Sequence, residues 1–481
     1  MTVVKKPSLL IALVPVIILV LLLSLNVYAF ADNSSYGPNQ FALLFSAIIT
    51  ALIGVFHLNH SYDEIEKKTI QSISVALQAM LILLVVGSLI GVWILGGIVP
   101  TMIYYGVNLI SPAFFLPVCL VICSVVSLAT GSSWSTVGTV GIALVGIGQA
   151  LGIPDGMIAG AIVSGSYFGD KMSPLSDTTN LAPAMAGSNL FEHIKHMLYT
   201  SGPAYIITFI IFICLGLFYS TDHLDDQKIN ALLTTIDSSF NISIWLFSLP
   251  LIVFILVKKK VPALPALLAG TILGGLYAVF FQSDLLAKLA SGEMNLLSNY
   301  KVILTVCFDG FSHETGNAVV DKLFNRGGMS GMLNTVWLIL MAMIFGGMME
   351  VTGMLGRIAE SILRVVTGVT SLVASTIGTS IFLNLTTSDQ YIAIVVTGRM
   401  FKSAYDEQNL APKNLSRAVE DGATVTSVLI PWNTCGAYFS SVLGISTLTY
   451  LPFAFFNLLS PLMSILVAMT GISMEKKTEK L

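Results

Sequence analysis

The chain has 481 residues, of which 55% are hydrophobic and only 10% charged, and its formal net charge is −3. Soluble proteins carry about 25% charged residues, so this composition excludes a chain folded in water and predicts an integral membrane protein. A membrane-spanning helix needs about 20 apolar residues, and runs of that length recur from Leu9 to Thr470. The near-neutral charge offers no basic surface to nucleic acid, and no nucleic-acid partner is expected.

The apolar runs are continuous, which is typical of transmembrane helices and not of barrel strands, where apolar and polar residues alternate. We therefore expect an all-α integral membrane protein with about ten transmembrane helices plus two re-entrant hairpins. In chain order, the segments are expected near residues 8–28, 39–58, 69–97, 112–130, 134–152, 155–182, 202–219, 241–257, 261–281, 333–353, 366–384, 389–403, 415–440 and 451–470. The hairpins are 112–152 and 366–403, and the other segments cross fully.

The basic residues indicate how the helices are oriented. With two hairpins, both termini lie on one side, and most of the 23 lysine and arginine residues fall on that side. The positive-inside rule identifies it as the cytoplasmic side. Residues 1–68 are then expected to form transmembrane helices 1 and 2, the first of them retained rather than cleaved as a signal peptide, and residues 471–481 a cytoplasmic tail.

One arrangement of elements occurs twice in the chain. It consists of a long helix, a hairpin with a polar tip, a broken helix with a polar centre, and a closing helix. The copies are 69–219 (tip 129–136, broken helix 155–182) and 333–470 (tip 385–391, broken helix 415–440), joined by connecting helices and an outer loop in 220–332. The first copy begins inside and the second outside, so the repeats are inverted.

Inverted repeats with broken helices are the architecture of secondary transporters, in which substrate and ions bind near the membrane midplane. Irregular backbone at that depth is tolerated only where it lines a site enclosed by protein. We therefore expect the tips and breaks to form the functional site. The outer loop, 282–330, is long for a bare connection, and we expect it to fold back as an interfacial helix or a gate.

Five carboxylates are expected inside the membrane, namely Asp170, Asp177, Asp389, Glu420 and Asp421. A charge at a helix centre costs at least ~2.5–3.5 kcal/mol, so each carboxylate must be neutralised by a proton, a cation or a partner. A carboxylate that holds either a proton or a sodium ion, combined with alternating access, produces sodium/proton exchange.

Oxygen-bearing side chains surround these acids, and Na⁺ prefers oxygen ligands as other hard cations do. The candidate ion- and proton-binding residues are Asp177, Asp389, Asp170, Ser133, Ser135, Thr136, Ser173, Ser176, Thr178, Thr179, Asn180, Thr386, Thr387, Ser388, Asn433 and Thr434. Asp177 is the strongest candidate because it belongs to a Ser-Asp-Thr-Thr-Asn run just after the helix-breaking Pro174. Transported sodium is the only metal expected, and the sequence predicts no cofactor.

Ion pairs are the alternative for some of these acids. Asp170 is next to Lys171 in the sequence. In one interpretation, the two side chains form an internal ion pair. Glu420 and Asp421 lie within one turn of Arg417, where a structural ion pair fits as well as an ion site.

Several motifs resemble those of NhaC-type sodium/proton antiporters, a family that includes the malate/lactate antiporter branch and belongs to a broader ion-transporter superfamily. They are GDKMSPLSDTTN at 169–180, GSSWST at 131–136, TGN at 315–317 and RGGM at 326–329. The resemblance covers nearly the whole chain. It implies a carrier of the bacterial inner membrane, with sodium sites related by inverted symmetry and roles in sodium extrusion and growth at alkaline pH.

Two kinds of transported substrate are compatible with the sequence. The first is exchange of Na⁺ for H⁺ alone, with the lipid bilayer as the other partner. The second is sodium- and proton-coupled exchange of an organic acid of the malate/lactate type, in which Lys171 would be the anion partner. A homodimer is compatible with either. The chain lacks the Gly-x-Gly-Asp signature of intramembrane aspartyl proteases, so the protein is expected not to be an enzyme. Paired sites in broken helices fit alternating access better than an open channel.

Overall fold

The computed structural model describes residues 4–30, 34, 36–219, 226–290, 295–364 and 366–477, and within them the chain is almost entirely helical. The α-helices are α1 (Leu9–Phe30), α2 (Pro38–Phe56), α3 (Tyr62–Leu95), α4 (Ile98–Leu109), α5 (Pro112–Thr130), α6 (Ser133–Thr136), α7 (Ile142–Ala150), α8 (Asp155–Met172), α9 (Asp177–Ala186), α10 (Leu190–Tyr219), α11 (Asp226–Ser239), α12 (Ser248–Lys258), α13 (Ala263–Phe281), α14 (Ser283–Leu289), α15 (Leu296–Asp309), α16 (Ala318–Phe324), α17 (Leu333–Val351), α18 (Met354–Leu363), α19 (Val369–Thr387), α20 (Gln390–Glu407), α21 (Pro412–Val419), α22 (Val425–Ser427), α23 (Thr434–Leu443), α24 (Thr447–Tyr450) and α25 (Phe455–Thr470).

Short π-helical and 3-10 segments complete the helices. The π-helical segments are η2 (Val137–Gly141) and η5 (Glu420–Thr424), and the 3-10 segments are η3 (Ile244–Phe247), η4 (Ser330–Met332) and η6 (Leu451–Phe453). Among the described residues, eight helices are long and apolar enough to cross a membrane, or up to ten if each of two bent pairs is one span. The prediction of an all-α, multi-pass membrane protein is confirmed.

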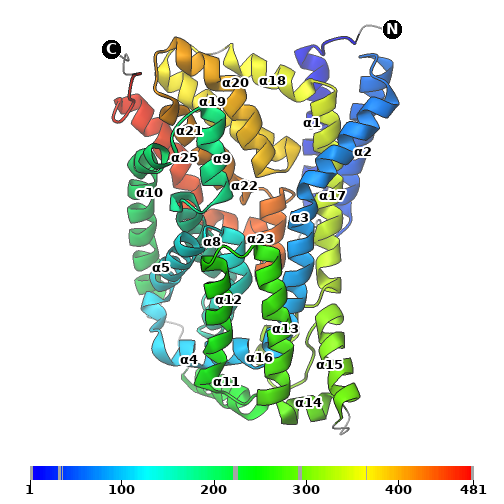
Figure 1. Cartoon of the computed structure of the whole chain (residues 1–481), viewed down its shortest axis with the longest axis vertical. Coiled ribbons are helices and arrows are strands. Elements are labelled where there is room, and N and C mark those ends of the chain that lie inside the picture. The colour runs from blue at the N-terminus through cyan, green and yellow to red at the C-terminus, as the bar shows by residue number, and fades with distance from the viewer. Residues whose placement is uncertain are drawn as a thin grey trace.

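The inverted repeats are visible in the order and orientation of the helices. In each repeat a long helix, α3 or α17, is followed by a short helix whose N-cap is a glycine with positive φ, Gly97 (77°) or Gly353 (71°). Only glycine adopts this left-handed conformation without strain, so the chain turns sharply there. The short helices α4 and α18 then lie at opposite ends of the molecule (Figure 1). The chain enters α1 and leaves α25 at the same end.

Each repeat continues into a hairpin and a broken helix, as predicted. The first hairpin turns at residues 131–132 and the second at 388–389. The first broken helix consists of α8 and α9, with residues 173–176 between them, and the second consists of α21, η5, α22 and α23, interrupted at 428–433. The first broken helix starts at the predicted residue, Asp155, after Pro154 as its N-cap, and the second starts at Pro412, three residues before the predicted 415.

Close packing fixes the first broken helix against the first hairpin. Gly165 and Gly169 face α5, and the hydroxyl of Ser127 donates a 2.6 Å hydrogen bond to the backbone oxygen of Ser166. A Cβ atom at Gly165 would lie 2.9 Å from the Cβ of Cys123. Small residues let membrane helices approach this closely, so α8 is held in register with the hairpin that carries the first tip.

Replacing Gly165 by alanine is expected to lower the free energy of unfolding by about 1–3 kcal/mol, because the added methyl overpacks the contact with α5. Thermal unfolding of the purified protein in detergent measures the loss. Gly378→Ala is the matched control, since no atom lies within 4 Å of a Cβ built at that helical position. Equal stability of the two variants would contradict the role of this contact.

The described residues of 282–330 contact α3 through α15 and the chain after it. The backbone N–H of Gly328 donates to the oxygen of Gly87 at 2.7 Å, and that of Met329 donates to Cys307 at 3.0 Å. Beyond α15, the side-chain hydroxyl and backbone N–H of Thr315 donate to Asp321 and lower the pKa of its carboxyl. This part of the chain is therefore ordered helix and turn, and its place on the outer side and its role as an interfacial helix or a gate stay predictions.

Candidate ion-binding site

A cavity of about 930 Å³ lies where both hairpin tips and both helix breaks meet. Ser132 and Ser135 reach it from the first tip, and Asp389 from the second. Asp170 lines it from the first broken helix and Thr434 from the second. The structure thus brings the four predicted polar clusters to one place, although they are separated by up to about 300 residues in the chain.

In the first repeat, the acid comes from the broken helix and its hydroxyl partner from the hairpin tip. Asp170 is 7% exposed, and its Oδ2 accepts hydrogen bonds from the Oγ and the backbone N–H of Ser133, at 2.6 and 3.0 Å. The tip is held against the break by Gly131, where a Cβ would lie 2.6 Å from the Cβ of Leu175. A carboxylate offers about four acceptor positions, so Asp170 retains acceptor capacity for a cation.

In the second repeat, the roles of the two elements are exchanged. Asp389 belongs to the hairpin tip and is 3% exposed. Its Oδ1 caps α20 by accepting from the N–H groups of Tyr391 and Ile392, at 2.9 and 3.1 Å, and its Oδ2 accepts from the Oγ1 of Thr434 at 3.3 Å. The backbone N–H of Thr434 also donates to the oxygen of Ser388 at 2.8 Å. Each repeat therefore joins one acid to one hydroxyl across its tip and break.

Each tip also carries a buried hydroxyl that has no hydrogen-bond partner among the described residues. These are Ser135, 3% exposed, and Ser388, 0% exposed. Ser388 has a φ of 60°, which is uncommon for a residue other than glycine. Ser135 lines the cavity, whereas Ser388 is not among its lining residues, and buried side-chain atoms elsewhere in the described residues also lack a partner.

Most of the other predicted oxygens are engaged within the protein. Hydroxyls that donate to backbone oxygens belong to Thr136, Ser173, Thr179, Thr386 and Thr387. The hydroxyls of Ser176 and Thr178 pair with each other at 3.1 Å, Asn180 bonds to the oxygens of Pro174 and Ser176, and Asn433 caps α23. These side chains shape the breaks and tips, and their hydroxyls and amides are largely committed.

Asp177, the strongest candidate from the sequence, lies differently from Asp170 and Asp389. It is the first residue of α9, it lines the cavity, and it is exposed. Asp177 is therefore open to the cavity, whereas Asp170 and Asp389 are buried, and its place inside the membrane stays a prediction. Its position at the N-terminus of α9 places its charge where the helix dipole favours it.

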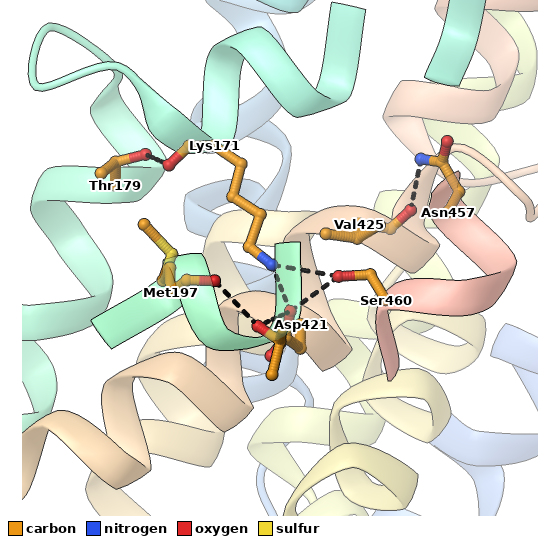
Figure 2. A network of polar contacts seen from close by, with 8 residues as sticks. Lys171, Thr179, Met197, Asp421, Val425, Asn457 and Ser460 are labelled. Carbon is orange, nitrogen blue, oxygen red and sulfur yellow. Dashed lines mark hydrogen bonds and ion pairs between the residues drawn. The ribbon is translucent and has the colours of Figure 1, made fainter. Parts of the chain in front are cut away.

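Lys171 does not pair with its neighbour Asp170, and this corrects the ion pair considered from the sequence. Its ammonium instead forms an ion pair with Asp421, and both side chains are 0% exposed. Ser460 of α25 bonds to Lys171 Nζ at 3.0 Å and to Asp421 Oδ1 at 2.7 Å, and Thr200 lies 3.4 Å from the same oxygen. Figure 2 shows Lys171 reaching across to Asp421 from the first broken helix. The pair joins the two repeats.

The ion pair considered for Arg417 is also replaced by other contacts. Its guanidinium donates to Ser473 Oγ at 2.7 Å and to Met474 Sδ at 3.2 Å, in the chain after α25. The described residues contain no ion pair between Arg417 and either Glu420 or Asp421. One reason is that Asp421 is already engaged by Lys171.

Several residues of the site escaped the sequence analysis. The side-chain amide of Asn384 donates to the oxygen of Ala423 at 2.6 Å, which ties the second hairpin to the second broken helix. Lys260, in the turn between α12 and α13, lines the cavity. Trp134 at the first tip stacks on Tyr438 of α23, with ring centroids 4.1 Å apart. The only sequence signal for Asn384 was a polar residue within an apolar helix.

Comparisons with known proteins agree with this architecture. The Na⁺/H⁺ antiporter family matches residues 165–472. The Na(+)/H(+) antiporter NhaC of Alkalihalophilus pseudofirmus is 41% identical over 90% of this chain and 91% of the relative. The malate-2H(+)/Na(+)-lactate antiporter of Bacillus subtilis is 38% identical over 90% of each chain. The arginine/ornithine antiporter ArcD of Halobacterium salinarum is 33% identical over 98% of this chain and 94% of the relative. The chain belongs to the Na⁺/H⁺ antiporter family.

Proposed function

We propose that this protein exports Na⁺ in exchange for H⁺ by alternating access, as a carrier in a bacterial inner membrane with both termini in the cytoplasm. The observation that carries the proposal is the pair of reciprocal contacts, Asp170 with Ser133 and Asp389 with Thr434, in one cavity. Each contact places a carboxylate and a hydroxyl oxygen together, which is the ligand chemistry that a hard cation prefers.

Exchange follows from what a buried carboxylate can hold. An ionised carboxylate at this depth is costly unless it is compensated, so Asp170 and Asp389 are stable either with a cation or with a proton. The unpartnered hydroxyl of Ser135, which lines the cavity, would supply a further oxygen to the cation. Asp177, exposed in the cavity, would attract Na⁺ into it.

The two repeats would carry these sites together. We assign residues 69–219 and 333–470 to the repeats, residues 1–68 to two preceding helices and 220–332 to the connection between the repeats. In secondary transporters alternating access is largely a rigid-body movement of one bundle against another around the binding site. The contacts Asp170–Ser133 and Asp389–Thr434 each lie within one repeat, so such a movement would leave them intact.

Exchange of an organic acid is the second candidate, and the size of the cavity favours it. A water molecule occupies about 30 Å³ of liquid, so about 930 Å³ exceeds what a sodium ion needs. The malate-2H(+)/Na(+)-lactate antiporter is among the relatives. Lys171 would be a poor partner for the anion because it is buried and paired with Asp421, whereas Lys260 lines the cavity.

Proteoliposomes with an imposed pH gradient test the two candidates. We expect Na⁺ alone to dissipate the gradient with the unmodified protein. Dissipation only when malate or lactate is also supplied would replace this proposal by organic-acid exchange, and no response to either would contradict both. Asp177→Asn is expected to raise the Na⁺ concentration for half-maximal exchange by only a few-fold, because its exposed charge is screened by water and salt.

Ser133→Ala is expected to raise the Na⁺ concentration for half-maximal exchange by about tenfold or more, since a hydrogen bond to a charged group contributes about 1.5–3 kcal/mol. Without the hydroxyl, ionised Asp170 is less stable and protons compete better with Na⁺, so the effect should shrink as the pH rises. Initial exchange rates over a range of Na⁺ concentrations and pH values measure it. The control is Thr208→Val, whose buried hydroxyl bonds within α10; a similar change in both variants would contradict the prediction.

A further inference from the structure

A glutamine beside the second acid faces the cavity and takes part in none of the contacts described so far. Gln390 follows Asp389 as the first residue of α20, lines the cavity and is 4% exposed. The carboxylate of Asp389 already accepts from two backbone N–H groups and from the hydroxyl of Thr434. Since a carboxylate offers about four acceptor positions, a cation held at Asp389 needs oxygens from neighbouring groups as well.

The side chain of Gln390 is held by Ser427, the last residue of α22, which is 0% exposed. The hydroxyl of Ser427 lies 3.2 Å from Gln390 Oε1 and 2.7 Å from the backbone oxygen of Thr424. Tyr167 reaches the same hydroxyl from the first broken helix, with its own hydroxyl at 3.2 Å. Cys435 also contacts Ser427, but a thiol is only a weak donor or acceptor.

The single proton of the Ser427 hydroxyl cannot serve both acceptors. The oxygen of Thr424 is the nearer one, at 2.7 Å against 3.2 Å for Gln390 Oε1, and therefore takes the proton. Tyr167 is then the donor in its own contact with Ser427. What remains on the Ser427 oxygen is one position that can accept a hydrogen bond, and this position faces Gln390.

The amide nitrogen of Gln390 is the donor that matches this position. Among the described residues this nitrogen has no hydrogen-bond partner. A half-turn about the last side-chain bond exchanges the oxygen and the nitrogen of the amide, and both orientations are accessible to a glutamine. After the half-turn the amide N–H donates to Ser427, and the amide oxygen is free for a ligand in the cavity.

We propose that Gln390 is a further ligand of the transported cation, beside Asp389, and that Ser427 is the residue that orients its amide. This inference rests on the proposed function. Amide oxygens are ligands of hard cations, as carboxylate oxygens are. An amide is also neutral, so it adds an oxygen while Na⁺ and the charge of Asp389 still balance each other inside the membrane.

Gln390→Leu removes the amide oxygen at nearly constant side-chain size, and ²²Na⁺/Na⁺ exchange in proteoliposomes at equal pH measures the effect. We expect the half-saturating Na⁺ concentration to rise about tenfold or more and the maximal rate to stay within about threefold, because the variant loses binding and not movement. Gln408→Leu is the matched control. It replaces an exposed glutamine just beyond the other end of α20 and should change neither quantity.

Ion selectivity separates a ligand from a residue that only supports the fold. The number of ligands and the size of the site decide which cation fits. Gln390→Leu should therefore change the ratio of the Li⁺ to the Na⁺ half-saturating concentration by about threefold or more, whereas a general loss of structure would affect both ions equally.

Ser427→Ala tests the orienting role. It should change the half-saturating Na⁺ concentration and the ion ratio in the same direction as Gln390→Leu, but less. The double variant Gln390→Leu/Ser427→Ala should behave as Gln390→Leu alone, because Ser427 acts through the amide. Additive effects of the two substitutions would overturn the orienting role.

The outcomes separate this inference from the proposed function. An unchanged half-saturating Na⁺ concentration and ion ratio in folded Gln390→Leu would overturn the inference and leave the proposed function intact. Absence of ²²Na⁺/Na⁺ exchange by the unmodified protein would overturn both. If Gln390→Leu does not fold, Ser427→Ala decides: a shifted ion ratio supports the inference, and an unchanged ratio overturns it.

Discussion

Replacing Asp421 by alanine is expected to lower the free energy of unfolding by about 3–5 kcal/mol, because Lys171 would be left as an uncompensated charge in the membrane domain. The hydrogen bonds from Ser460 and Thr200 would also lose their acceptor. Thermal unfolding of the purified protein in detergent, followed by the loss of monodisperse protein, measures the effect. Lys171→Met is expected to act in the same direction, since it leaves Asp421 ionised and unpaired.

The double variant Lys171→Met/Asp421→Leu is expected to recover most of this stability. Replacing a whole buried ion pair by apolar residues of similar volume is often neutral or stabilising, whereas removing one partner is costly. Lys477→Met serves as the control, because its ion pair with Asp406 is 2.7 Å long but exposed, and exposed pairs contribute about 0–1 kcal/mol. If the double variant were as unstable as the less stable of the two single variants, the loss of stability could not be explained by an unpaired buried charge, and the prediction would be wrong.

Asp170→Asn is expected to reduce Na⁺ transport at least about 100-fold. The amide has nearly the same shape and can still accept from Ser133, but it has no negative charge to balance a cation inside the membrane, where an unbalanced charge costs at least ~2.5–3.5 kcal/mol. Uptake of ²²Na⁺ in exchange for internal Na⁺ measures the loss without reference to protons.

Asp284→Asn is the control for that prediction, since Asp284 is exposed on α14 outside the cavity. The substitution is chemically the same, so it corrects for any effect of removing one negative charge from the protein. If Asp170→Asn exchanged Na⁺ as fast as Asp284→Asn, the cation would have to bind elsewhere, and Asp389 would become the principal candidate.

The fold could be predicted because its signals are local. Apolar runs define the helices, and Pro174 and Gly131 interrupt the chain in a way that needs no knowledge of distant residues. The repeated order of hairpin and broken helix then predicts inverted repeats. The positions of Asp170 and Asp389 near the tips and breaks followed from the same signals.

The pairing of charges could not be predicted, because it depends on which helices pack together. Lys171 and Asp421 are separated by 250 residues, whereas the partners proposed from the sequence, Asp170 and Arg417, were chosen for being close in the chain. The exposure of Asp177 could not be predicted for the same reason. A carboxylate in a polar, proline-broken segment can face either the packed interior or the cavity, and only the arrangement of the neighbouring helices decides.

The stack of Trp134 on Tyr438 gives the cavity an optical reporter of its own. Trp134 belongs to the first tip and Tyr438 to the second broken helix, and the Tyr438 hydroxyl donates to the Trp134 backbone oxygen at 3.0 Å. Indole emission responds to the polarity and contacts around the ring, so any ion that loosens or tightens this junction between the repeats should alter the fluorescence of Trp134. A variant that keeps this tryptophan and replaces the other four would allow ion binding to be followed in solution without any attached dye.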